Sequence, residues 1–143
     1  MEFATPISHL FEDVQSARRI ASASDCLECR DHTLDNGLPD QKLFHCDKEI
    51  VHPWSGEDRA YIEKIVMSKP DLRLISFHMA SCCSHPKLVD GMFQPEGQIY
   101  GRDELIGFAR GNIRWIKEVV HQRGIEIAVE NNNYYPTAAY EHV

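Results

Sequence analysis

A run of nine mostly apolar residues, 72–80 (LRLISFHMA), constrains the fold of this chain more than any other segment. Its composition is typical of a strand that is buried on both faces, as in the parallel sheets of α/β proteins. Leu74, Ser76 and His78 share one side of this predicted strand, because successive side chains of a strand alternate. We therefore expect the rest of the chain to supply helices that cover a sheet.

A second strand is predicted within residues 125–135 (IEIAVENNNYY), where Ile125, Ile127 and Val129 recur with period two. A long helical pattern, 104–123, ends at Gly124 just before it. Glu130 then faces away from the covering helices, at the carboxyl end of the strand, where parallel sheets and barrels form ligand sites. A carboxylate there fits a metal ligand or an acid/base group, and the alternative is a solvated glutamate on a surface strand.

The other elements complete a repeated strand–helix order. Short strands are predicted at 25–30 and 42–47, and an amphipathic helix at 9–22 with Ser8 as its N-cap. Ser55 and Asp58 form the capping-box pattern of a helix that Pro70 ends. Residues 81–101 are expected to form a long irregular loop, and Asp103 to cap the helix 104–123. This order indicates one parallel α/β domain with right-handed crossovers.

Length, charge and cysteine content narrow the classes of function. The 143 residues fit a single domain, 1–143, with a real core. The net charge of −7, without a run rich in lysine and arginine, argues against nucleic acid as a partner. No stretch approaches the ~20 apolar residues of a membrane span, so we expect no membrane contact. Five cysteines, an odd number without a secretory signal, favour a cytoplasmic setting.

Four of the cysteines are candidate ligands of a structural zinc ion: Cys26, Cys29, Cys82 and Cys83. On a strand, residues three apart face opposite sides, so Cys26 and Cys29 could not share an ion. The adjacent Cys82 and Cys83 do not make the second C-x₂-C that a zinc ribbon requires. We therefore expect no structural zinc, whereas a nucleophilic role for Cys82 or Cys83 stays open.

The predicted strands place chemically capable side chains toward their carboxyl ends. His45, His78 and Glu130 are the residue types that metal and acid/base chemistry uses, and Glu28 lies in the corresponding region of the strand 25–30. We predict Glu130 and His78 as metal ligands and catalytic groups. Glu28, His45 and Asn131 are the predicted substrate-binding residues.

Structural alternatives stand beside these roles. His78 is equally well explained as a satisfied core histidine. Glu28 fits a residue that pairs with Arg30 or His32 inside the sheet. Asn131 either orients Glu130 or meets a substrate hydroxyl.

Three short motifs carry a resemblance to a known family. The segments LECR at 27–30, ISFHMA at 75–80 and IAVENN at 127–132 resemble the xylose isomerase-like TIM-barrel superfamily, which includes sugar isomerases and epimerases and nucleases of the endonuclease IV type. The resemblance implies a (β/α)₈ barrel with a divalent metal at its carboxyl-terminal mouth. It matches Glu130 to a metal-ligand glutamate of the superfamily, and His78 and His45 to histidine ligands of the endonuclease branch. A whole barrel takes ~250 residues, so we expect only its first half here, about strands 1 to 5.

Three hypotheses for the function follow. The first is a metal-dependent sugar isomerase or epimerase that uses Mn²⁺, Zn²⁺ or Mg²⁺ as a Lewis acid on a sugar or sugar derivative. The second is an endonuclease IV-like zinc phosphodiesterase, which the acidic balance opposes. The third is a half-barrel that is inactive until a second copy or a complementing chain completes it.

Overall fold

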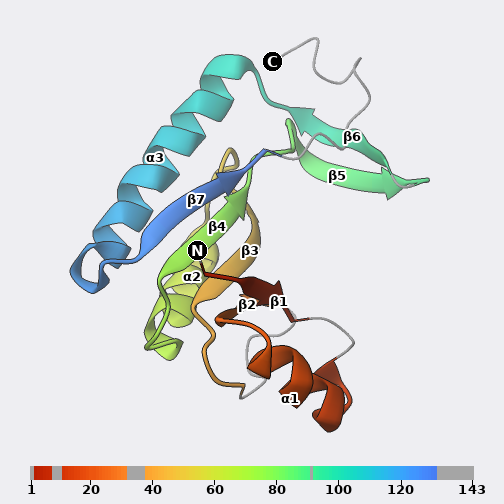
Figure 1. Cartoon of the computed structure of the whole chain (residues 1–143). Helices are drawn as coiled ribbons and strands as arrows, with labels where there is room; N and C mark the ends of the chain where they lie inside the picture. Colours follow the sequence, from red (N-terminus) through yellow and green to blue (C-terminus); the bar gives the residue numbers. More distant parts are fainter. Residues whose placement is uncertain (1, 8–10, 32–37, 91, 132–143) are drawn as a thin grey trace.

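A five-stranded parallel sheet is the centre of the structure, a computed structural model that describes residues 2–7, 11–31, 38–90 and 92–131. The strands follow the order β1-β2-β3-β4-β7, and each pairs in parallel with its neighbours (Figure 1). Their bounds are Ala4–Pro6 for β1, Cys26–Arg30 for β2, Leu43–Glu49 for β3, Leu74–His78 for β4 and Glu126–Glu130 for β7. The predicted parallel α/β fold is thereby confirmed at the level of its class.

The two faces of this sheet differ in burial. One face carries side chains that are 0–1% exposed and form the core with the helices: Leu27, Cys29, Phe44, Cys46, Ile75 and Phe77. On the opposite face Leu43, Leu74 and Ala128 are only half-buried. Strand alternation produces this division, since residues of the helices Gly56–Ser68 (α2) and Arg102–Val120 (α3) join the core on one face of the sheet.

Helix α2, Gly56–Ser68, begins as its sequence predicts. The Ser55 hydroxyl accepts from the Asp58 backbone N–H at 3.1 Å, and the Asp58 carboxylate accepts from the Ser55 N–H at 2.9 Å. This reciprocal pair satisfies two backbone donors that the first helical turn leaves without partners. The helix ends before Pro70, and it buries Ile62, Ile65 and Val66 in the core.

Helix α3, Arg102–Val120, starts two residues earlier than Glu104 and takes Gly101 as its N-cap, so the predicted cap Asp103 is wrong. The physical reason is Glu104, whose carboxylate accepts from the Gly101 N–H at 2.9 Å. A 3₁₀ turn, His121–Arg123, follows the helix. Gly124 then takes φ 63° in the left-handed region, which confirms it as the residue that ends the helical segment.

Helix α1, Val14–Ser22, is shorter than the predicted 9–22. Asp13 is its N-cap, because the Asp13 carboxylate accepts from the Ser16 N–H at 2.7 Å. Val14, at the start of the helix, is 64% exposed, whereas Ala17 is buried. The predicted cap Ser8 lies outside the described residues.

The predicted irregular loop 81–101 is wrong. The segment 81–101 contains an antiparallel hairpin of β5, Cys83–Val89, and β6, Met92–Ile99. The two strands form a sheet of their own. Figure 1 shows this hairpin extending away from the ends of β4 and β7. Prolines obscured the pattern, yet Pro86 and Pro95 face each other in the ladder. Among the described helices, none is long and apolar enough to cross a membrane.

Candidate metal centre

Three side chains that can ligate a metal converge at the carboxyl ends of adjacent strands. His45 lies on β3, His78 on β4 and Glu130 on β7, and one potential ligand atom from each lies within 4.8 Å of the other two. The register explains the convergence, because His78 pairs directly with Glu130, and His45 pairs with Ser76, two residues before His78. All three side chains belong to the face of the sheet opposite the buried core.

Backbone bonds fix the strand ends that carry these residues. The His78 carbonyl accepts from the Ile50 N–H at 2.8 Å, and the Met79 N–H donates to the Glu130 carbonyl at 2.9 Å. The Glu49 carboxylate accepts from the Ala80 N–H at 2.9 Å, just beyond His78. These contacts hold the site on rigid strands rather than on loops.

The two histidines face each other closely. Their Nε2 atoms are 2.6 Å apart, and their ring centroids are 4.7 Å apart with the planes tilted by 57°. A neutral imidazole has one N–H and one lone pair, so one ring donates to the other across this gap. Two imidazoles on a tetrahedral zinc would hold their nitrogens about 3.3 Å apart. The two rings would therefore move apart by roughly 0.7 Å when an ion binds between them.

Two oxygen atoms lie near the other ring nitrogen of His45. Its Nδ1 is 3.1 Å from the Ser76 hydroxyl and 3.3 Å from a Glu130 carboxylate oxygen. Burial and then the charge of His78 lower the pKa of His45, although Glu130 opposes this shift. A histidine held neutral keeps the lone pair that a metal requires.

The donor set fits a divalent ion on its chemistry. Two imidazole nitrogens and one carboxylate oxygen make a set found in zinc sites that leave a further position open for water or substrate. His45 is 6% exposed, while the Glu130 side chain is 45% exposed, so the site is closed on one side and open to solvent on the other. The three residues therefore could hold the ion and leave room for a ligand.

The other predicted site residues lie around this cluster. Glu28 pairs with Arg30 at 3.3 Å, which is the structural alternative that its position suggested. Arg30 is in register with His45 on the neighbouring strand, and Asn131 is exposed directly after β7. His45, a predicted substrate-binding residue that the resemblance also matches to a histidine ligand, lies in the cluster with His78 and Glu130.

Two further residues, Ser76 and Glu49, contact the site in the structure. Strand parity predicts only that Ser76 shares a side of its strand with His78, and no sequence pattern points to Glu49. The signal for Ser76 was available in its parity with His78, but its contact with His45 depends on the register between β3 and β4. Glu49 lies next to the register shift in the pairing of β3 with β4. No sequence pattern indicates this shift.

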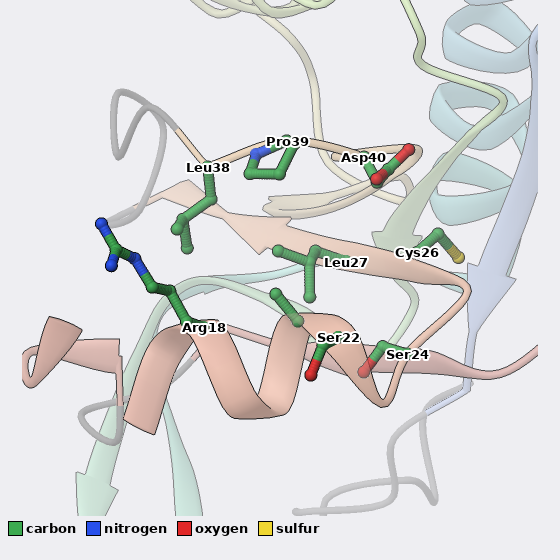
Figure 2. Close-up of a pocket in the computed structure, with 9 residues that line it drawn as sticks. Arg18, Ser22, Ser24, Cys26, Leu27, Leu38, Pro39 and Asp40 are labelled. Carbon is green, nitrogen blue, oxygen red and sulfur yellow. The ribbon is translucent and has the colours of Figure 1, made fainter. Parts of the chain in front are cut away.

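A separate pocket of about 320 Å³ lies between α1, β2 and the segment 38–40 (Figure 2). Its lining includes Arg18, Ser24, Leu27 and Asp40, and none of the residues of the metal cluster. It borders the start of β2, the opposite end of the sheet from the cluster. The pocket therefore contributes nothing to the candidate metal centre.

Comparisons with protein-family models, curated proteins and solved structures give no match for this chain. The fold and the site define it as an α/β protein with a five-stranded parallel sheet. A cluster of two histidines and one glutamate marks the carboxyl edge of that sheet.

Proposed function

We propose that this chain binds one divalent metal ion between His45, His78 and Glu130. It would act as part of a sugar isomerase or epimerase of the parallel (β/α)-barrel type. The observation that carries the proposal is the convergence of three ligand atoms within 4.8 Å from three adjacent parallel strands. The expected substrate is a sugar or sugar derivative.

The strand order supports a barrel over a doubly wound sheet. In doubly wound sheets the order of strands reverses at a switch point, whereas in a (β/α)₈ barrel each parallel strand pairs with the next one. The order β1-β2-β3-β4-β7 contains no reversal, because the hairpin between β4 and β7 forms its own sheet. In this proposal the five strands correspond to the first five of a barrel, and the half-buried face corresponds to its interior.

The residues of the site would divide the chemistry between them. A bound ion would polarise a carbonyl or hydroxyl oxygen of the sugar. His45 and His78 would hold it through neutral nitrogens, and a set of imidazoles with a carboxylate suits Zn²⁺ or Mn²⁺ better than Mg²⁺. Glu130 would hold the ion or move the proton, and Glu28 and Asn131 would meet substrate hydroxyls. The chain alone would be inactive until a second copy or a complementing chain covers the open face.

Ion binding by the full chain tests the proposal without requiring turnover. We expect the wild-type protein to take Zn²⁺ and Mn²⁺ from a chromogenic chelator in a competition titration. Glu130→Gln should weaken binding by more than about 100-fold, beyond the effect of losing an orienting partner. Glu126→Gln is the matched control, since Glu126 lies on the same side of β7 at its other end and should leave binding unchanged. A wild-type chain that competes for neither ion would contradict the proposal.

One observation favours a second candidate. His45 lies in the cluster as a potential ligand, as in the endonuclease branch of the resembling superfamily, rather than as a substrate contact. A zinc phosphodiesterase would follow from that arrangement, although the net charge of −7 opposes binding to nucleic acid. Cleavage of duplex DNA that contains an abasic site would favour this candidate over the isomerase.

A further inference from the structure

The Nδ1 atom of His45 has two oxygen neighbours of different chemistry. The Ser76 hydroxyl lies 3.1 Å away and a Glu130 carboxylate oxygen 3.3 Å away. A carboxylate only accepts hydrogen bonds, so its position near Nδ1 favours a proton on that nitrogen of His45. The lone pair of the ring is then on Nε2, the atom that faces His78 at 2.6 Å.

This arrangement gives Glu130 two tasks that exclude each other. The two nitrogens of an imidazole point to opposite sides of the ring, so a carboxylate oxygen held against Nδ1 is directed away from an ion on Nε2. If Glu130 ligates the ion, the Nδ1–H of His45 loses that acceptor. A buried N–H left without an acceptor is destabilising, and His45 is 6% exposed.

Ser76 is placed to take over this bond. It lies on β4 directly beside His45 of β3, and both side chains belong to the same face of the sheet. A serine hydroxyl can accept while it donates its own proton elsewhere, and Ser76 is half-buried, so its hydroxyl can reach solvent. The two strands are paired here without a bulge, because the register shift in this pair lies beyond Cys46.

We propose that Ser76 is a positioning residue of the metal centre: its hydroxyl accepts the Nδ1–H of His45 and thereby frees Glu130 to bind the ion. This inference rests on the proposed ion site for its consequence, but the hydrogen bond itself exists without an ion. When its hydroxyl accepts from Nδ1–H, Ser76 leaves the lone pair of His45 on Nε2. It thus keeps Nε2 available as a ligand while the carboxylate changes its partner.

The first test uses ion-free protein and reads the tautomer of His45 by long-range ¹H–¹⁵N correlation spectroscopy. Glu130→Ala imitates the loaded state, since the carboxylate has left Nδ1. We expect His45 to keep its proton on Nδ1 in this variant. Adding Ser76→Ala should shift the population toward the Nε2–H form, and Ser76→Thr in its place should retain Nδ1–H. Loss of the Nδ1–H form in Glu130→Ala alone would overturn the proposal.

The second test measures zinc affinity by chelator competition. Ser76→Ala should weaken binding about 10- to 100-fold, the range seen when a partner of a ligating histidine is removed, and Ser76→Thr should restore it. Ser68→Ala is the control, because its hydroxyl bonds to the Ile65 carbonyl at the end of α2. Unchanged affinity in Ser76→Ala would overturn the proposal. If the wild type binds no ion, the proposed function fails, and the tautomer measurement still decides whether Ser76 holds His45.

Discussion

The Nε2 atoms of His45 and His78 lie 2.6 Å apart across the neighbouring strands β3 and β4. Only one proton fits between them, so the ion-free pair is stable with at least one neutral ring. Burial, followed by the charges of His78 and Arg30, lowers the pKa of His45 below its ordinary value of 6.5, against the opposite effects of Glu130 and Glu28. His45 therefore takes up a proton less readily in the folded state than in the unfolded state.

The ion-free protein should therefore lose stability as the pH falls below about 6.5. In that range unfolded His45 takes up a proton that folded His45 refuses, so the unfolded state binds more protons and the free energy of unfolding rises with pH. Urea unfolding across pH 5–8 measures the slope. Half-buried His52, whose pKa is also lowered by burial, adds to the slope with the same sign.

The matched variants separate the contribution of His45. His45→Gln should flatten part of the pH dependence, because it removes a buried histidine whose pKa is lowered in the folded state. His85→Gln, on the exposed surface of the hairpin, should keep the wild-type slope. Identical slopes in wild type and His45→Gln would contradict the role given to burial.

The two faces of the sheet should differ in their sensitivity to truncation. Phe77 is 0% exposed in the core, so Phe77→Ala should lower the free energy of unfolding by about 3–5 kcal/mol. Leu43 is half-buried on the opposite face, and Leu43→Ala should lower it by only about 1–2 kcal/mol. Chemical denaturation at one pH compares them. Equal losses would show that both faces are covered in solution.

The capping box of α2 should make a measurable contribution to stability. Ser55→Ala removes the acceptor of the Asp58 N–H, and we expect a loss of about 1 kcal/mol in the free energy of unfolding. Ser22→Ala is the control, because its exposed hydroxyl donates to the Arg19 carbonyl of its own helix. It should change stability by less than about 0.5 kcal/mol. A cap without effect would indicate that α2 is ordered by its packing alone.

The open face should promote association. Leu43, Leu74 and Ala128 lie half-buried on it, and exposed apolar faces and sheet edges drive chains together. Sedimentation of the purified chain should therefore show a dimer or larger species, and Leu74→Lys should weaken its formation. A stable, compact monomer that unfolds cooperatively would contradict the barrel proposal.

Local patterns were sufficient for the elements whose signals lie within a few residues. The capping box of Ser55 and Asp58, the apolar run of β4 and the stop at Gly124 each depend on neighbouring residues in the chain, and the structure confirms all three. The predicted cap Asp103 is wrong because Glu104 offers the stronger local partner. The Glu104 carboxylate accepts from the Gly101 N–H, so α3 begins after Gly101.

The hairpin shows a limit of a different kind. Proline and glycine within 83–99 predict a break in any strand. Gly97 nevertheless fits the ladder, because it takes a φ of 76°. A Cβ added at this position would meet the Ser84 hydroxyl at 2.5 Å. Pairing between β5 and β6 satisfies the backbone groups that the composition alone leaves unassigned. A cross-strand partner is not visible in a single-strand pattern.

The sequence by itself determined which residue types stand near the ends of the strands, since parity along each strand already separates His78 and Glu130 from the core side chains. Only the tertiary structure decided their partners. The register of β3 against β4 brings His45 within 2.6 Å of His78 and 3.1 Å of the Ser76 hydroxyl. Register is fixed by packing across the whole sheet, because a slip of one residue would turn every side chain to the opposite face. That dependence on distant segments is why the identity of the residues could be predicted and their contacts could not.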